Sequence, residues 1–169
     1  MDPDGNIFVV YKIDGNSIGH GGNCNNGVEP IVSTPIMIQP MERDGITPRG
    51  KAVKILDRGP ADGPSVEAPS LARAPDGTYF LFFSSNCYAG PNYDISYATA
   101  SNIMGPYTKS SAPLLVTGSG PNRNLFSPGG ADVTPDGKTI IFHADKGTTA
   151  DTRQMYIGHL SLSGTTVTI

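Results

Sequence analysis

Glu67 is the residue of this sequence best placed for acid–base chemistry. It stands in the segment Val66-Glu67-Ala68-Pro69, near the start of a predicted strand and among apolar neighbours. A carboxyl group in an apolar surround has a raised pKa and can act as a general acid. A surface glutamate that opens a strand has the same local sequence, so the segment alone leaves both interpretations open.

Three other charged or titratable side chains could bind a ligand, and each also has a plainer explanation. His143 ends an apolar run, where a core histidine is the commoner case. Arg153 could hold sugar hydroxyls or a carboxylate with its guanidinium fork, or be an ordinary exposed charge. His20, in a glycine-rich loop, could contact a ligand or brace that loop. Because the sequence has no Trp, stacking on a sugar would need Tyr or Phe, and the candidates are Tyr88, Tyr93 and Phe126.

A repeated hairpin predicts how these side chains are positioned. The triplet Pro-Asp-Gly occurs at residues 3–5, 75–77 and 135–137, and a strongly apolar, β-type run follows each copy. Pro presets φ, Asp bonds its own backbone and Gly supplies a positive φ, so each triplet predicts a tight turn between strands. The three aspartates are 72 and 60 residues apart, which indicates a copied structural unit.

The copies divide the chain into units 1–64, 65–120 and 121–169. We expect strands at 34–39 and 51–56 in the first unit, after the one that follows its turn. The second has 66–74, 78–84, 95–100 and 114–116, and the third 131–134, 139–143, 154–162 and 165–169. Units of four short strands are propeller blades, and the first unit lacks the strand before its turn. The expected fold is therefore all-β, a partial β-propeller of four-stranded antiparallel sheets. A compact β-sandwich with such turns by chance is the alternative.

Composition excludes several classes of partner. The 21 Gly and 15 Pro residues, with 16% charged residues, disfavour long amphipathic helices. A net charge of −3 and a pI near 5.5 give no electrostatic footprint for nucleic acid. No apolar run reaches the ~18 residues of a transmembrane helix, so no membrane partner is expected.

The blade topology gathers the candidate residues on one face. If the Pro-Asp-Gly turns lie at one face of the disc, first strands begin and second strands end at the other. That face collects Glu67, His143, Arg153 and His20, with Asp145 and both cysteines. Cys24 and Cys87 each follow the second strand of their unit, so we expect a disulfide between neighbouring blades. Two separate thiols are the alternative.

Several segments together carry a resemblance to a known family, and they are residues 2–5, 14–26, 66–70, 79–88, 96–99, 105–107 and 142–145. In order and spacing, these segments resemble glycoside hydrolase family 43, in particular its fungal secreted members. The resemblance covers essentially the whole chain and implies a five-bladed propeller, of which about three blades are present. It implies hydrolysis, with inversion, of arabinofuranosyl or xylosyl linkages in plant cell-wall polysaccharide.

The resemblance also implies residue roles. Glu67 would be the general acid, and Arg153 would reach the sugar in the innermost subsite, with His20 and Tyr88 as further substrate contacts. His143 matches a histidine near the propeller axis that often helps to hold calcium or another ion, although the chemistry itself requires no cofactor. The protein is expected to be secreted, with its signal peptide outside this chain.

The sequence departs from the family pattern in its carboxyl groups. The family's base, and the aspartate that tunes the acid, lie upstream of residue 1. Glu67 precedes Asp76 by nine residues, and the same offset from Asp4 falls before Met1. Inverting hydrolysis needs an acid and a base about 6.5–9.5 Å apart. We therefore expect an N-terminally truncated enzyme that is inactive alone. A non-catalytic carbohydrate-binding propeller and a structural propeller are the alternatives.

Overall fold

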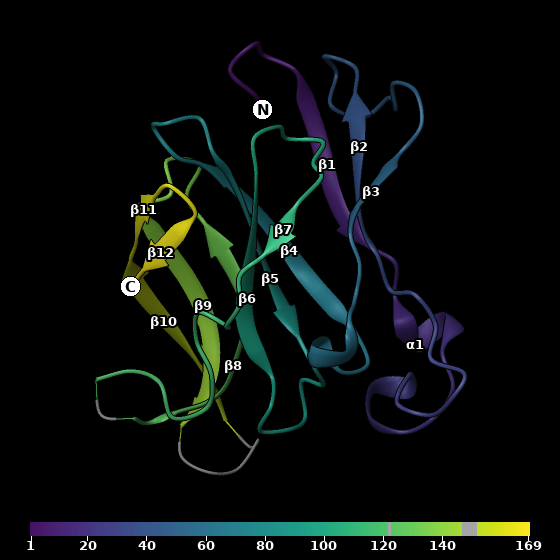
Figure 1. Cartoon of the computed structure of the whole chain (residues 1–169), viewed down its shortest axis with the longest axis vertical. Helices are drawn as coiled ribbons and strands as arrows, with labels where there is room; N and C mark the ends of the chain where they lie inside the picture. Colours follow the sequence, from purple (N-terminus) through teal and green to yellow (C-terminus); the bar gives the residue numbers. More distant parts are fainter. Residues whose placement is uncertain (122, 147–151) are drawn as a thin grey trace.

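Three antiparallel sheets follow one another along the chain in the computed structural model, which describes residues 1–121, 123–146 and 152–169 (Figure 1). The first sheet contains β1 (Ile7–Lys12), β2 (Ile36–Met41) and β3 (Val53–Leu56). The second contains β4 (Val66–Arg73), β5 (Tyr79–Ser85), β6 (Asp94–Ala100) and β7 (Thr108–Lys109). The third contains β8 (Leu125–Val133), β9 (Thr139–Lys146) and β10 (Arg153–His159). A hairpin of β11 (Ser161–Ser163) and β12 (Thr166–Thr168) follows.

The described helices are all short. They are α1 (Gly15–Ile18) and the 3₁₀ turns η1 (Asn23–Asn25) and η2 (Pro60–Asp62). No helix in the described ranges has the length and hydropathy of a membrane span.

The predicted Pro-Asp-Gly turns are confirmed. Gly5, Gly77 and Gly137 have φ values of 81°, 95° and 67°, the left-handed region that glycine adopts without steric cost. In the second and third copies the aspartate also accepts a hydrogen bond from the backbone N–H two residues on, at 2.9 Å for Asp76 and 3.1 Å for Asp136. The chain therefore reverses at these points for local reasons.

The sheets pack face to face, with a hydrophobic core on each side of the second sheet. Along β5, Leu81 and Phe83 face the first sheet, where they pack with Ile36, Ile38 and Ile55. Phe80 and Phe82 face the third sheet, where they pack with residues such as Ile140 and Phe142. The side chains of a strand alternate between faces, so a strand covered on both sides needs a continuous apolar run. This arrangement confirms the all-β, partial-propeller fold.

The first sheet begins one strand later than the second and third. β1 follows the first Pro-Asp-Gly turn, just as β5 and β9 follow theirs. The strand that precedes the turn is β4 in the second sheet and β8 in the third. Among the described residues the first sheet has no such strand, and β1 forms its edge.

Strand ends at the rim differ from the predictions. The fourth strand of the second sheet is Thr108–Lys109, and of the predicted strand 114–116 only Leu115 forms an isolated bridge, to Ile95. The predicted strand 154–162 is divided, because Leu160 leaves β10 to bury its side chain in the core. The predicted strand 165–169 pairs in the separate β11–β12 hairpin rather than with β10. Apolar burial thus overrides local strand propensity.

Candidate functional site

Glu67 is the second residue of β4, and both oxygens of its carboxyl group have partners. The Lys12 ammonium lies 2.7 Å from Oε2, and the Tyr93 hydroxyl donates to Oε1 at 2.6 Å. The side chain of Glu67 is 21% exposed. The β4–β5 register shifts just after it, and Ala68 adopts a φ of 49°, which is uncommon for a residue with a side chain. Such a bulge re-aims a strand and recurs beside active sites.

The predicted apolar surround of Glu67 is wrong. Successive side chains of a strand point to opposite faces, so apolar sequence neighbours need not surround a residue. Val66 is buried in the core between the first and second sheets, while Glu67 meets an ammonium and a phenol hydroxyl. Burial opposes the charge of Lys12, but its hydrogen bond to Glu67 and the charges of Glu67 and Asp14 outweigh burial. The pKa of Lys12 is therefore raised, and it stays a cation at neutral pH.

Tyr93 is held beside Glu67 by two glycines of β8, Gly129 and Gly130, whose backbone packs against the rings of Tyr93 and His143. A Cβ atom on Gly129 would lie 1.9 Å from the Tyr93 ring, and one on Gly130 would lie 2.7 Å from the His143 ring. The glycine pair on β8 thus lets the backbone approach both rings closely. Burial, and then the negative charge of Glu67, raise the pKa of the Tyr93 hydroxyl, so it keeps its proton and acts as a donor.

His143 continues the same group of contacts. Its ring stacks on Tyr93 with the centroids 6.1 Å apart and the planes 15° from parallel. Arg153 Nη1 donates to Nε2 of His143 at 3.0 Å. A guanidinium has donors only, so the neutral ring must accept at Nε2 and carry its proton at Nδ1. Burial, and then the Arg153 charge, lower the pKa of His143, although Asp145 and Glu67 partly oppose this.

Arg153 and Tyr88 form the exposed end of the group. The guanidinium of Arg153 lies 5.5 Å from the centroid of the Tyr88 ring and 6.0 Å from that of Tyr93. Its Nη2 atom donates to the Tyr88 carbonyl oxygen at 3.3 Å. Tyr88 is 53% exposed, so an apolar ring face and guanidinium donors meet solvent together. We call Glu67, Lys12, Tyr93, His143, Arg153 and Tyr88 the Glu67 cluster.

A disulfide ties two loops together beside this cluster. Cys24 and Cys87 are bonded, with their Cα atoms 5.4 Å apart and a sequence separation of 63. The bond joins the β1–β2 loop to the β5–β6 loop, which carries Tyr88. His20 lies in the first of these loops, is exposed, and donates from Nδ1 to the Pro30 carbonyl oxygen at 2.9 Å. Its described contact is therefore the loop-bracing one.

Asp145 is the most deeply buried acid near the cluster. It is 1% exposed, and its two carboxylate oxygens and Nδ1 of His143 have no hydrogen-bond partner in the described parts of the chain. His143 and Asp145 are two residues apart on β9, so they share one face of that strand. No group of three or more His, Cys, Asp or Glu residues suited to a metal occurs within the described ranges.

Two members of the cluster were missed or misjudged from sequence. Lys12 was not predicted to act at all, although a lysine that ends the apolar strand Ile7–Lys12 is a signal for a buried or paired charge. Tyr93 was considered only for sugar stacking, whereas its hydroxyl binds Glu67. Neither contact has a local sequence signature, because the partners lie 55 and 26 residues from Glu67.

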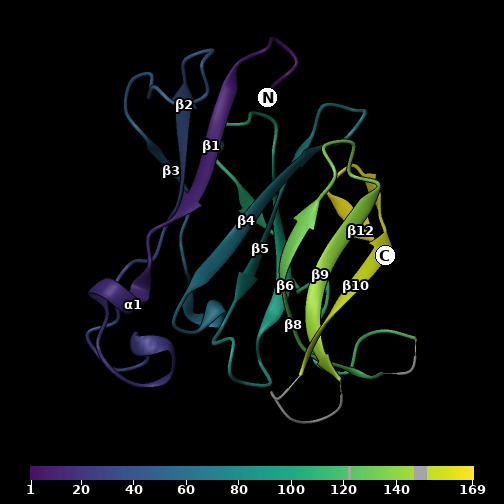
Figure 2. The ribbon, with the colours of Figure 1, turned by 180° about the vertical axis from the view of Figure 1, so that it is seen from behind.

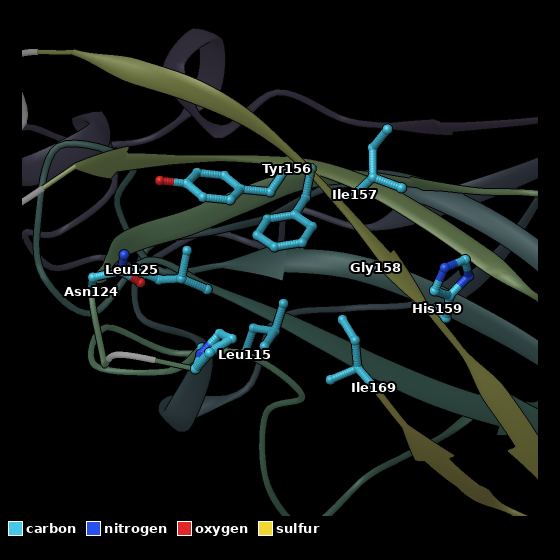
Figure 3. A pocket seen from close by; sticks show the side chains of 11 residues that line it. Leu115, Asn124, Leu125, Tyr156, Ile157, Gly158, His159 and Ile169 are labelled. Carbon is cyan, nitrogen blue, oxygen red and sulfur yellow. The ribbon is translucent and has the colours of Figure 1, made fainter.

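One pocket of the described structure lies away from this cluster. It has a volume of about 820 Å³ and is lined mostly by apolar side chains, among them Leu115, Leu125, Phe142 and Ile169 (Figure 3). None of the residues of the Glu67 cluster lines it. Its described lining includes His159 but no Asp or Glu side chain, so it offers no pair of carboxyl groups.

Comparison with known proteins identifies the family. The model of glycosyl hydrolases family 43 matches residues 4–164. A thermostable family-43 glycoside hydrolase has 25% identity and a TM-score of 0.76, over 98% of this chain and 54% of that one. An endo-1,4-beta-xylanase from Bacteroides thetaiotaomicron has 25% identity and a TM-score of 0.76, over 99% and 55%. An arabinanase from Bacillus subtilis has 21% identity and a TM-score of 0.67, over 95% and 51%.

No match was found among the curated proteins. The chain spans about half the length of the solved structures described above, at 51–55% of their chains. The family match covers almost all of this chain, and the sheets, turns and carboxyl-bearing cluster agree with it. The chain belongs to glycosyl hydrolases family 43.

Proposed function

We propose that this chain is part of an inverting glycoside hydrolase that cleaves arabinofuranosyl or xylosyl linkages of plant polysaccharide, with Glu67 as the general acid. The observation that carries the proposal is the placing of the Glu67 carboxyl group. It is largely buried, bound by Tyr93, and linked through Tyr93 and His143 to the exposed Arg153 and Tyr88. The similar solved structures that are named as a xylanase and an arabinanase support the substrate class.

The contacts of Glu67 suggest which oxygen transfers the proton. Tyr93 donates to Oε1, which leaves Oε2 to carry the proton toward a leaving group. Lys12 contacts Oε2 and would exchange that contact for the glycosidic oxygen. As the bond from the anomeric carbon to that oxygen breaks, the oxygen keeps the electron pair and takes the proton. Water attacks the anomeric carbon from the opposite face and gives its proton to a carboxylate base.

We place that base, and the third carboxyl group, in sheets outside this sequence. Acid and base stand about 6.5–9.5 Å apart in inverting enzymes. The support is that the chain covers 54% and 55% of two similar solved chains, and that β1 has no preceding strand in the described structure. The chain alone should therefore hydrolyse neither aryl arabinofuranosides nor aryl xylosides.

Arg153, Tyr88 and His20 are proposed as the substrate contacts. The guanidinium of Arg153 offers donors to sugar hydroxyls, and Tyr88 offers a ring face at the same exposed point. His20 supports this wall of the site through its loop, which the disulfide ties to the loop of Tyr88. The disulfide also supports a secreted protein, because such bonds persist in oxidising compartments.

A hard cation near His143 is a further part of the proposal. The two buried, unpartnered oxygens of Asp145 are the donor type that calcium prefers. The proton at Nδ1 of His143 would direct that ring to a water of the ion rather than to the ion itself. An ion here would neutralise a buried carboxylate and steady β9, with no part in the chemistry.

One observation favours a second candidate, a non-catalytic carbohydrate-binding protein. A carboxyl oxygen that binds an ammonium group is not free to present a proton to a leaving group. The Lys12–Glu67 pair is such a contact. In this case the exposed Arg153 and Tyr88 bind a sugar, and the chemistry is lost.

Substitution of Glu67 tests the two candidates. In a version of the enzyme that includes the upstream sheets, Glu67→Gln should lower turnover of natural arabinosides or xylosides by at least ~100-fold, the scale of general acid catalysis. Aryl substrates should lose less, since their leaving groups need less protonation. Equal rates for wild type and variant on both substrates would end the assignment of Glu67. Oligosaccharide binding without turnover in both proteins would favour the second candidate.

A further inference from the structure

The two oxygens of the Glu67 carboxyl group are held by donors that differ in their freedom to move. Lys12, which contacts Oε2, has a side chain that is 30% exposed, and its ammonium group also lies 3.3 Å from Asp14. Tyr93, which donates to Oε1, is only 3% exposed. A lysine has a flexible four-carbon stem and here has a second carboxylate within reach, so it can leave Oε2. A ring in a close-packed interior has no such freedom.

The Tyr93 ring is confined by residues of the third sheet. β4, which carries Glu67, lies beside β8, and β8 pairs with β9 (Figure 2). The backbone of Gly129 on β8 packs so closely on the ring that a Cβ atom there would lie 1.9 Å from it. The ring of His143 on β9 stacks on Tyr93 with the centroids 6.1 Å apart. The Tyr93 hydroxyl therefore stays at Oε1 unless these strands move.

Ser84 orients the hydroxyl of Tyr93. It lies directly opposite Glu67 in the β4–β5 register and is fully buried. Its Oγ atom accepts from the N–H of Gly130 at 2.9 Å, which leaves the Ser84 proton for another acceptor. Burial and the charge of Glu67 raise the pKa of the Tyr93 hydroxyl, and a hydrogen bond from Ser84 partly opposes them. The Tyr93 oxygen thus receives the Ser84 proton, and the Tyr93 proton points at Oε1 of Glu67.

We propose that Tyr93 is a positioning residue, which fixes the Glu67 carboxyl group so that the transferred proton sits on Oε2. The terminal torsion of a glutamate is broad and roughly two-fold, so a carboxyl group without a fixed partner presents either oxygen. A protonated carboxyl group has one O–H, and the oxygen that already accepts from a buried hydroxyl is the poorer place for it. Tyr93 keeps its contact throughout, while Lys12 moves from Oε2 to Asp14 as the sugar enters. This role of Tyr93 rests on the proposed role of Glu67 as the general acid.

The variant Tyr93→Phe tests this role in the version of the enzyme that includes the upstream sheets. It keeps the ring and loses only the hydroxyl. Its kcat on natural arabinosides or xylosides should fall about 10- to 100-fold, the cost of a misplaced catalytic group, with KM little changed. Its kcat on dinitrophenyl glycosides should stay close to wild type, because that leaving group departs without a proton. Ser84→Ala should give a smaller loss of the same kind, since Tyr93 then keeps its contact with Glu67 but loses its orientation.

Tyr107→Phe is the matched control. The Tyr107 hydroxyl also makes a hydrogen bond, to the Ile103 carbonyl oxygen at 3.1 Å. It lies in the loop that follows β6, at the opposite end of the sheets from Glu67. Its removal should therefore alter the melting temperature at most, and leave kcat on both kinds of substrate unchanged.

Glu67→Gln, measured in parallel, separates the role of Tyr93 from that of Glu67. If Glu67→Gln loses mainly the turnover of natural substrates and Tyr93→Phe keeps it, Glu67 is the acid but Tyr93 does not position it. Equal losses on both kinds of substrate in Tyr93→Phe would mean a structural role and would overturn the proposal. If Glu67→Gln keeps wild-type rates on both, the acid assignment fails and the role of Tyr93 fails with it. Should Tyr93→Phe melt below the assay temperature, the same comparison of substrates in Ser84→Ala decides.

Discussion

The two ends of the sheets are held together by different kinds of contact. At the Pro-Asp-Gly end, the hydrogen bonds that close each turn are local: the Asp76 carboxylate accepts from the N–H two residues on, and the N–H of Gly77 donates to the carbonyl oxygen of Ala74. At the Glu67 end, contacts join residues far apart in sequence, by 55 residues for Lys12–Glu67, 63 for the disulfide and 65 for Arg153–Tyr88. The turn end can therefore form from local sequence, whereas the site end exists only when all three sheets are packed.

The largest effect on stability should come from removing the Cys24–Cys87 disulfide, which joins two loops at the Glu67 end. Cys24→Ser combined with Cys87→Ser should lower the free energy of unfolding by about 2–4 kcal/mol, because the unfolded chain regains the entropy of a closed loop. Urea unfolding of the oxidised wild type and of the double variant measures the difference. Free-thiol titration of the unreduced wild type should find no reactive thiol. Equal free energies of unfolding for the two proteins would contradict the stabilising role assigned to this disulfide.

A methyl group at Gly129 should destabilise the packing around the Tyr93 ring at the Glu67 end. The added Cβ would meet the Tyr93 ring at 1.9 Å, so Gly129→Ala should cost about 1–3 kcal/mol, the usual scale of overpacking. Gly90→Ala is the matched control: its Cβ would have its nearest neighbour at 3.7 Å, so its stability should stay near wild type. Thermal melts followed by near-ultraviolet circular dichroism report both stability and the Tyr93 environment. Similar losses for both variants would show that glycine content, not ring packing, matters here.

A change at the turn end should have a smaller and strictly local effect. Gly77→Ala forces a side chain to adopt a φ of 95°, which should cost about 1 kcal/mol. Since the turn closes through its own residues, the Glu67 cluster should be unchanged. Oligosaccharide binding measured by calorimetry should therefore match wild type, while the melting temperature falls. Loss of binding in Gly77→Ala would break the contrast between the two ends.

The smallest expected effect is a change in how the stability of the protein depends on pH, and it comes from His143 at the Glu67 end. Burial and the Arg153 charge lower the pKa of His143 below its ordinary 6.5, so the unfolded chain binds this proton more readily than the folded one. The stability contribution of the neutral ring is present above pH 6.5 and declines as the pH falls from there through the lowered pKa. Melting temperatures between pH 8 and 5 should decline less steeply for His143→Gln than for wild type. Arg153→Gln should give an intermediate slope, because burial remains; identical slopes in all three would refute the assignment.

Much of the fold followed from sequence because its signals are local. The Pro-Asp-Gly triplets, each followed by an apolar run, predicted the turns, the strands after them and the all-β propeller architecture. Strand ends at the rim were predicted less well. There Leu160 and Leu115 follow the nearest core rather than their own propensity, and that core is made by other sheets.

The sequence by itself determined where the chain turns, that a strand follows each turn, and that Glu67, His143, Arg153 and both cysteines meet at one end of the sheets. Only the tertiary structure decided that Lys12 and Tyr93 hold the two oxygens of Glu67, and that the His143 ring reaches Tyr93 past Gly129 and Gly130. The physical reason is the separation in sequence between the residues that interact. A turn is set by the φ preferences of adjacent residues, whereas a charge or a ring finds its partner only after packing brings distant strands together.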